Sequence, residues 1–157
     1  MEIHPIGTLH TPHTQLEAMP IQPKGALEIK GQALLHPEYI EGLNDLDGFS
    51  HIYLIYHFHK TTRTELTVVP FMDTETRGVF STRSPLRPTH IGMSIVRITK
   101  VTKDTLHFTG ADMLDGTPLL DIKPYIENFD HIEESTSGWM TADKKTVSEK
   151  RSDNRFV

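Results

Sequence analysis

Cysteine is absent from this sequence of 157 residues, which excludes disulfide bridges, thiolate metal sites and cysteine nucleophiles. An apolar run near the ~18 residues that a membrane-spanning helix needs is also missing. The opening segment, MEIHPIGTLHTPHT, lacks a basic stretch followed by an apolar one, so we expect no signal peptide. The lack of cysteine does not decide the compartment, so we expect the default, a globular protein of the cytoplasm, and no membrane partner.

Three loop motifs of nucleotide-binding and hydrolytic enzymes are missing as well. The chain contains no G-x-G-x-x-G, no G-x-x-x-x-G-K-[ST] and no G-x-S-x-G. A ligand that contains adenosine must therefore be bound without a glycine-rich turn between a strand and a helix. The sequence also shows no alternation of strands with long helices, which argues against a doubly wound α/β fold.

Short strand-like segments separated by turn residues account for most of the chain. They are HPIGTLH, GALEIKGQALL, SHIYLIYHFH, ELTVVPF, GMSIVRITKV, DTLHFTG and TPLLDIKPYI, the last one after the turn signal Asp115-Gly116. PEYIEGL at 37–43 predicts only a turn or two of helix. The pattern predicts a mostly β fold, a single antiparallel β-barrel with short helical excursions, over residues 1–135. Residues 136–157 are polar, and we expect them to form a loosely held C-terminal tail.

The segment 50–59 has the clearest alternation and predicts an interior strand. One face carries Ile52, Leu54, Tyr56 and Phe58, and the other carries His51, Tyr53, Ile55, His57 and His59. The first set is a core face. The three histidines of the second face could bind a metal, but no carboxylate accompanies them in the strand and no H-E-x-x-H occurs, so we assign no metal. We interpret this face as a polar cleft or a contact between subunits.

Carboxylates are absent from the stretch 76–103, TRGVFSTRSPLRPTHIGMSIVRITKVTK, although the whole chain has a formal net charge of −5. Its charges up to residue 97 are all arginine, the side chain best suited to gripping planar anions. Pro85 and Pro88 bracket Arg87 and restrict its backbone, and Gly92 permits close approach of a ligand or another chain. A solvated loop is the alternative. We interpret the stretch as a focused anion or nucleic-acid site with Arg87 in its wall.

Four segments, in this order, resemble the tRNA-methyltransferase O (TrmO, TsaA-like) family: MPIQPKG, DLDGFSHIYLIYHFHK, RGVFSTRSPLRPTHIGMSIVRI and MLDGTPLLDIKPY. The resemblance runs from about Ile6 to Tyr125. It implies an S-adenosyl-L-methionine-dependent enzyme that methylates N6 of threonylcarbamoyl-adenosine in the anticodon loop of tRNA. It also implies a homodimer built on an antiparallel barrel, outside the Rossmann-like methyltransferase folds.

The resemblance assigns cofactor contacts position by position, at Gln22, Pro23, Lys24, His59, Lys60, Arg87, Asp115, Gly116, Thr117 and Pro118. Lys60 and Arg87 suit the carboxylate of the cofactor or a phosphate of RNA, because a cationic sulfonium gains nothing from them. Substrate contacts are expected at Arg77, Arg83, Thr89, His90 and Arg97. Thr89-His90 stands where the family has Asn-Pro, so the choice of substrate could differ here.

Methyl transfer to a carbamoylated adenine nitrogen requires alignment of donor and acceptor and loss of a proton from nitrogen. The candidate general bases are His59, His90, Asp121 and Tyr125. Asp121 could equally form an ordinary ion pair with Lys123 on the same strand face, and Trp139 is more typical of a packing anchor for the tail. Two other functions stay open: methyl transfer to another RNA or a small molecule, and a non-catalytic module that binds S-adenosylmethionine.

Overall fold

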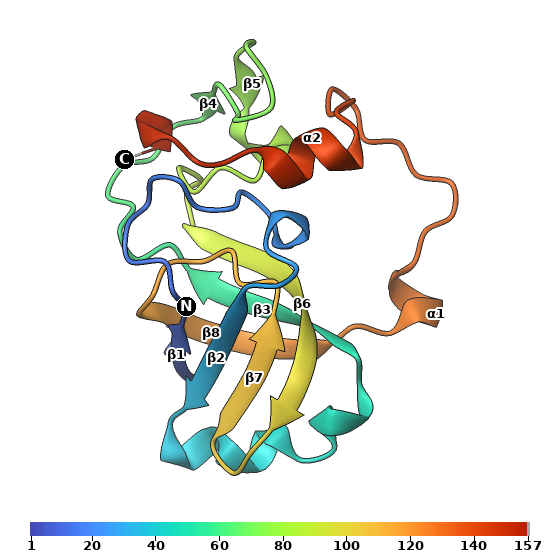
Figure 1. Cartoon of the computed structure of the whole chain (residues 1–157). Helices are drawn as coiled ribbons and strands as arrows, with labels where there is room; N and C mark the ends of the chain where they lie inside the picture. Colours follow the sequence, from blue (N-terminus) through green and yellow to red (C-terminus); the bar gives the residue numbers. More distant parts are fainter. Residues whose placement is uncertain (157) are drawn as a thin grey trace.

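Six strands close into one antiparallel barrel in the computed structural model, which describes residues 1–156 (Figure 1). Around the barrel the strands follow the order β1-β2-β7-β6-β3-β8, and each neighbouring pair is antiparallel. Their bounds are β1 Gly7–His10, β2 Lys30–Leu35, β3 His51–His57, β6 Ile91–Val101, β7 Thr105–Thr109 and β8 Thr117–Pro124. A separate small sheet pairs β4, Thr67–Val68, with β5, Arg77–Gly78. The predicted mostly β fold, a single antiparallel β-barrel, is therefore confirmed.

Alternate side chains of the strands fill the barrel interior, as the period of two requires. In β3, Ile52, Leu54 and Tyr56 are buried, and the strand pairs with β6 on one side and β8 on the other. The prediction of an interior strand over this segment is confirmed. Gly92 on β6 does allow a close approach, but the group that lies against it is the ring of Tyr56. A side chain at Gly92 would overlap this ring, so the glycine makes room for Tyr56.

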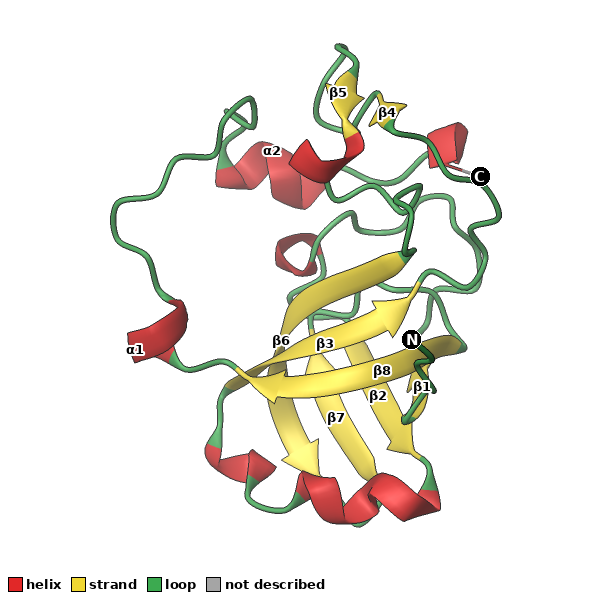
Figure 2. Cartoon of the chain, turned by 180° about the vertical axis from the view of Figure 1, so that it is seen from behind, coloured by secondary structure: helices red, strands yellow, loops and turns green. Residues whose placement is uncertain are grey.

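Helices in the described part of the chain are all short. The 3₁₀ helices are η1 Pro23–Gly25, η2 Pro37–Leu43, η3 Leu46–Gly48, η4 Val79–Ser81 and η5 Asn154–Phe156, and the α-helices are α1 Glu127–Asp130 and α2 Lys144–Glu149. The predicted helical turn at 37–43 is confirmed as η2. η2 and η3 cover the end of the barrel where β3 begins, the lower end in Figures 1 and 2. The opposite end carries the long loops, β4, β5 and α2. β3 ends there at His57, so His59 also lies at this end.

The C-terminal segment folds back onto this second end, which differs from the loosely held tail expected from its polar composition. Met19 donates its N–H to the Ser152 hydroxyl at 2.9 Å, and Ser152 donates its own N–H to the Met19 carbonyl at 2.8 Å. Phe156 packs edge-on against Phe71 with ring centroids 4.7 Å apart, and Val147 of α2 is buried. A few apolar side chains and one serine therefore hold the segment in place. Burying one large apolar side chain stabilises the folded chain by about 1.5–3 kcal/mol, so a few of them are enough to dock a segment that is polar overall.

Between the barrel and this tail the chain forms an exposed arm that includes α1, seen at the side of the molecule in Figure 2. Two apolar side chains of the arm, Phe129 and Ile132, are 79% and 69% exposed. The arm therefore leaves apolar surface without a partner in one copy of the chain. Among residues 1–156, no helix is both long enough and apolar enough to cross a membrane.

Candidate functional site

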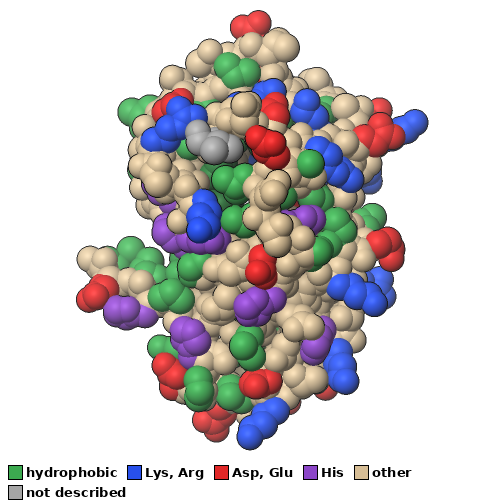
Figure 3. Space-filling model, turned by 60° about the vertical axis from the view of Figure 1, so that its left-hand side comes forward, with side chains coloured by type: hydrophobic (Ala, Val, Ile, Leu, Met, Phe, Trp, Pro, Cys, Tyr) green, Lys and Arg blue, Asp and Glu red, His purple; other side chains and the backbone are tan. Residues whose placement is uncertain are grey.

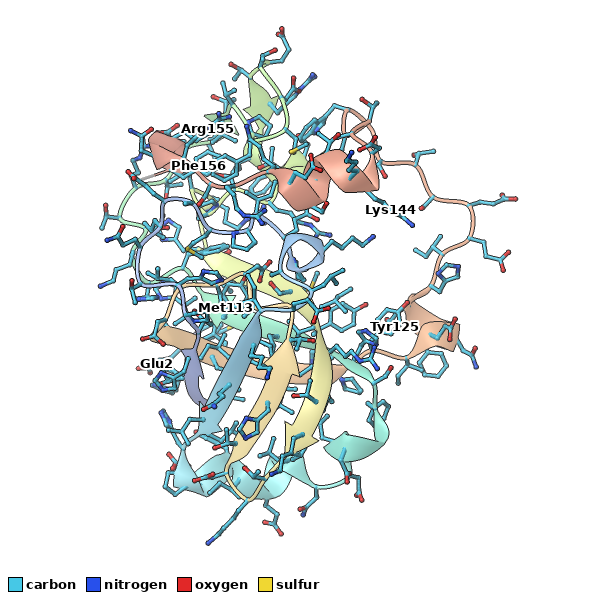
Figure 4. All side chains as sticks on the ribbon, in the orientation of Figure 1. Glu2, Met113, Tyr125, Lys144, Arg155 and Phe156 are labelled. Atoms are coloured by element: carbon cyan, nitrogen blue, oxygen red, sulfur yellow. The ribbon has the colours of Figure 1, made fainter. Side chains whose placement is uncertain are left out.

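A cavity of about 130 Å³ lies at the end of the barrel opposite η2 and η3. Five parts of the chain wall it: the loop before η1, the end of β3, the segment between β4 and β6, the turn before β8, and the C-terminal segment. Met19, Phe58, Met113 and Phe156 make much of its lining apolar. In Figure 4, Met113 lies at the top of the barrel, and Phe156 lies above it in the returning tail. The tail therefore supplies a wall of this first cavity.

Two further cavities adjoin the first one. A second cavity of about 220 Å³ is lined by Gln22, Pro23, Arg83, Arg87 and Gly92. Tyr56, Phe58 and Asp112 line both the first and the second cavity and so separate them. A third, wider cavity of about 560 Å³ contacts Gln22, Lys24, Arg83, Trp139 and Phe156. Together the three cavities surround one rim of the barrel.

The predicted cofactor residues are distributed over these cavities. His59, Lys60 and Thr117 line the first, Gln22, Pro23 and Arg87 line the second, and Lys24 lines the third. Asp115 lies outside all three: it is exposed, it accepts the N–H of Thr11 at 3.1 Å, and it lies 3.2 Å from the ring of His10. Gly116 and Pro118, its neighbours in the predicted turn, do not line these cavities either. The structure thus brings seven of the ten expected contacts to one rim.

His59 follows β3 and lines the first cavity. Burial, together with the positive charge of Lys60, lowers the pKa of His59 below its ordinary value. The Thr117 hydroxyl donates its proton to the Leu114 carbonyl at 2.6 Å, and it lies 3.4 Å from Nδ1 of His59. Because the hydroxyl proton of Thr117 goes to Leu114, the long bond between Thr117 and His59 needs a proton on Nδ1 of His59. In the neutral ring, Nε2 of His59 is then an acceptor. The ring is therefore set up to accept a proton or a hydrogen bond.

Asp112 is the functional candidate that the sequence interpretation missed. Ser94 donates its hydroxyl proton to Oδ1 of Asp112 at 2.7 Å, and the Tyr56 hydroxyl lies 3.0 Å from the Ser94 oxygen. Burial raises the pKa of Asp112 to about 7. A signal for it existed in the strand alternation, because Ser94 falls between Gly92 and Val96 on the face that points into the barrel. A polar side chain at such a core position implies a buried polar partner.

Arg87 holds its own loop together. Its Nε donates to the carbonyl of Ser84 at 3.1 Å, and its Nη2 donates to the carbonyls of Thr82 at 2.5 Å and Val79 at 3.4 Å. The side chain is half-buried beside the second cavity. Backbone carbonyls, in addition to the flanking prolines, therefore orient the guanidinium. Its predicted contact with an anion stays a prediction.

The other arginines of the stretch 76–103 have different surroundings. Arg77 pairs with Asp73 at 2.7 Å and lies over the ring of Trp139 at 5.6 Å. Arg83 is exposed and lines the second cavity together with Arg87, whereas Arg97 is exposed on the outer face of β6, opposite His51. On the face drawn in Figure 3, lysines and arginines are spread among other side chains. The role of each arginine in binding an anion or RNA stays a prediction.

Thr89 and His90 precede β6 on the outside of the barrel. Thr89 is exposed, and His90 has a left-handed backbone with φ of 50°. The His90 ring lies 3.1 Å from the Thr64 hydroxyl and stacks on His57 at a centroid distance of 6.4 Å. The histidine-rich face predicted for 50–59 is therefore extended by His90. Among the described residues, no three histidine or carboxylate side chains converge as they would around a metal ion.

The predicted catalytic residues are not brought together in one copy of the chain. Asp121 forms an ion pair with Lys123 at 2.9 Å on the outside of β8. Tyr125 packs against Tyr53 at 5.9 Å and donates its backbone N–H to His51, at the end of β3 far from His59. Figure 4 shows Tyr125 at the start of the exposed arm, across the molecule from Phe156. Of the four candidate bases, His59 lines one of these cavities, and His90, Asp121 and Tyr125 do not.

Trp139 anchors the tail, as its isolation in the sequence suggested. Its indole N–H donates to the carbonyl of Ser81 at 2.8 Å, and its ring carries the guanidinium of Arg77. The indole therefore ties the C-terminal segment to η4, at the edge of the third cavity. One face of the Trp139 ring is therefore covered by Arg77.

A closed antiparallel barrel with three adjoining cavities at one rim, and without a glycine-rich phosphate loop, defines a class of fold outside the Rossmann-like proteins. Residues 8–131 match the family model of the tRNA-methyltransferase O N-terminal domain. The chain belongs to this family, which confirms the resemblance seen in its motifs.

Relatives of the chain carry two kinds of description. A probable S-adenosyl-L-methionine-binding protein of Pyrococcus abyssi is 45% identical over 152 residues, which are 97% of this chain and 83% of the relative. The tRNA (adenine(37)-N6)-methyltransferase of Mus musculus is 36% identical, over 80% of this chain and 31% of that enzyme. A crystal structure of TrmO from Pseudomonas aeruginosa has a TM-score of 0.75 at 34% identity and covers 91% of this chain. The chain spans 63% of that structure's length.

Proposed function

We propose that this chain is an S-adenosyl-L-methionine-dependent N-methyltransferase that acts on N6 of threonylcarbamoyl-adenosine next to the anticodon of tRNA. Family membership and the descriptions of its relatives support the general class, methylation of tRNA adenine at N6. One observation carries the proposal. The adjoining first and second cavities at one rim of the barrel are lined by residues to which the family resemblance assigns the cofactor, including His59, Lys60, Thr117 and Arg87.

The side chains around the cavities suit this cofactor. Phe58 and Met113 offer apolar surface to an adenine ring or a methyl group, and Lys60 offers a cation to the carboxylate of the cofactor. Neither the first nor the second cavity alone reaches the ~300 Å³ of a typical ligand pocket. The cofactor would therefore extend across both. When bound it supplies an activated methyl group, and the chain holds the acceptor nitrogen in line with that group and shields it from water.

Exposed cations near the cavities are proposed to bind the tRNA backbone. Arg83 and Lys24 are exposed and line the third cavity, where a phosphate could approach them. Because the whole chain carries a net charge of −5, this binding is focused on the rim and is not spread over the surface. Arg77 contributes less, because Asp73 already neutralises its charge. Binding should weaken as salt concentration rises.

We also propose that the chain works as a homodimer in the cytoplasm. Met93 and Ile95 on the outer face of β6 are 48% and 40% exposed, and they lie beside Ile55 and Tyr53 of β3. The exposed arm adds Phe129 and Ile132. Apolar side chains that stay exposed on a sheet face and on a neighbouring arm are typical of a subunit contact. A second copy would cover both features.

The proposal is tested with purified chain, labelled S-adenosylmethionine and two tRNA preparations that differ only in threonylcarbamoylation of the adenosine. Mass spectrometry of the digested nucleosides should show one added methyl group on the threonylcarbamoylated tRNA alone. Methylation of both tRNAs would overturn the substrate and keep the class. Cofactor binding without methylation of either tRNA would favour a small-molecule methyltransferase or a non-catalytic binding module. Turnover in a screen of small acceptors then separates these two.

A further inference from the structure

We infer that Asp112 is the group that takes the proton from N6 during methyl transfer, with Ser94 and Tyr56 as positioning residues for its carboxylate. This inference rests on the proposed function. Asp112 lies in the loop between β7 and β8, and its side chain lines the first and the second cavity. A base in this place would face both the methyl donor in one cavity and an acceptor base that enters the other.

A directed chain of hydrogen bonds holds the carboxylate. Ser94 has a single hydroxyl proton and donates it to Oδ1 of Asp112 at 2.7 Å. The Tyr56 hydroxyl, 3.0 Å from the Ser94 oxygen, is then the donor in that second bond. Ser94 is 2% exposed and Tyr56 is 5% exposed, so packing fixes both groups. Burial also raises the pKa of Tyr56, so that its proton stays in place.

No side chain engages the second carboxylate oxygen. Within residues 1–156, Ser94 donates to Oδ1 of Asp112, and no side chain donates a hydrogen bond to Oδ2. Asp112 is only partly buried, and it borders both cavities. One oxygen is thus held by a side chain and the other is not, which is the arrangement that a general base needs.

The chemical step balances with this assignment. The N6 nitrogen forms a bond to the methyl carbon, and the bond between that carbon and sulfur breaks with its electron pair on sulfur. The N6 proton passes to Oδ2 of Asp112. The products are the N6-methylated nucleoside, the neutral thioether and a protonated Asp112, which returns its proton to water when the products leave. No further reactant is needed.

Charged and titratable groups surround Asp112 from several elements, namely Tyr56, His59, Lys60, Arg83, Arg87 and Asp153. Burial is the largest effect and raises the pKa of Asp112 to about 7, while the Ser94 bond and the charge of Arg83 act in the opposite direction. A carboxylate with such a pKa is a stronger base than an ordinary aspartate and is still partly ionised at neutral pH. His59 lines only the first cavity of the two.

The central test compares the parent chain with Asp112→Asn on threonylcarbamoylated tRNA at saturating cofactor. The amide keeps the shape and the Ser94 bond but cannot accept the proton. We expect kcat to fall by about 10²-fold or more. Affinities for S-adenosylmethionine and for its demethylated product, measured by calorimetry without turnover, should both stay within a few-fold. A loss of affinity for the sulfonium form alone would mean that the carboxylate attracts the cofactor's charge, and it would overturn the assignment.

A second variant separates a proton acceptor from a structural carboxylate. Ser94→Ala removes a donor to the charged form, so the carboxyl signal of Asp112 in the ligand-free protein, followed by ¹³C NMR, should titrate at higher pH than in the parent. The rising limb of kcat against pH should move in the same direction. Full activity of Asp112→Asn contradicts the inference but not the proposed function. The same holds if Ser94→Ala leaves the rising limb of kcat against pH where it is in the parent. If the parent chain methylates no tRNA, the inference and the proposed function are both wrong.

Discussion

At the scale of single residues, Asp112 and His59 share one cavity wall and respond to the same physical effect. Burial disfavours the charged form of each group, so it raises the pKa of Asp112 and lowers the pKa of His59. Both side chains are therefore closer to neutral than they would be in water. Groups whose pKa values are shifted in this way concentrate at functional sites, and here the two lie at the rim that also carries most of the predicted cofactor positions.

The raised pKa of Asp112 predicts how stability depends on pH. The folded chain binds this proton more tightly than the unfolded chain, whose aspartate has the ordinary value of 3.8. Stability is therefore lost as pH rises from about 4 to about 7, and no further above that range. The variant Asp112→Asn has no carboxyl group to ionise, so it should not lose stability in this way. Between about pH 4 and about pH 7, its free energy of unfolding should therefore rise by about 1–3 kcal/mol relative to that of the parent. This is less than the whole pKa shift of Asp112 would give, because the side chain is partly exposed to solvent.

Urea unfolding of both proteins at several pH values between about 4 and 8 measures this difference. A constant gap between parent and variant would show that Asp112 titrates normally in the folded chain.

Arg87 is the residue at which a structural and a binding role can be separated. Arg87→Ala removes three donor contacts to backbone carbonyls, so we expect a loss of about 1–3 kcal/mol in stability. Affinity for S-adenosylmethionine should fall by one to two decades, about 1.5–3 kcal/mol, if the guanidinium also grips the cofactor. Arg87→Lys should recover only part of either effect, because an ammonium lacks the planar fork.

Arg83→Ala is the matched control from the same loop, because its side chain is exposed. It should leave stability and cofactor affinity near parent values and weaken tRNA binding in a salt-dependent way. If Arg87→Ala loses stability but binds cofactor like the parent by calorimetry, its role is confined to the loop.

At the scale of elements, the C-terminal segment behaves as part of the site. Phe156 walls the first cavity and packs on Phe71, so Phe156→Ala should lower stability by about 1–3 kcal/mol and weaken cofactor binding several-fold. Leu66→Ala, at an exposed apolar residue outside the cavities and outside the proposed subunit contact, is the control, and we expect it to change stability by less than about 0.5 kcal/mol.

Hydrogen exchange of residues 144–156, with and without cofactor, gives an independent measure of docking. Cofactor should slow exchange there in the parent, and Phe156→Ala should reduce the protection. Equal exchange in the two proteins would mean that the tail does not respond to the site.

At the scale of the whole molecule, the proposed homodimer makes a direct prediction. Light scattering at micromolar concentration should give about twice the chain mass of 17.9 kDa. Ile95→Lys on the outer face of β6 should shift the mass toward one copy, because a charge would then be buried in the contact. Leu66→Lys, also at an exposed apolar residue but next to β4, is the control and should leave the mass unchanged. A monomeric parent would contradict the proposal.

The sequence alone determined the class of fold, the inward face of β3, the helical turn at 37–43 and the family, because alternation, turn residues and contiguous motifs are local properties of the chain. Only the tertiary structure decided that Asp112, Ser94 and Tyr56 meet. The register of β3 against β6 brings Tyr56 to Ser94, 38 residues apart, and the loop between β7 and β8 brings Asp112 to Ser94, 18 residues apart. The same holds for Asp121 and Tyr125, which share neighbouring sequence with the cofactor turn but lie away from the cavities. The tail is the third case. Its polar composition predicts loose attachment, whereas its few apolar side chains find partners that no local pattern reveals.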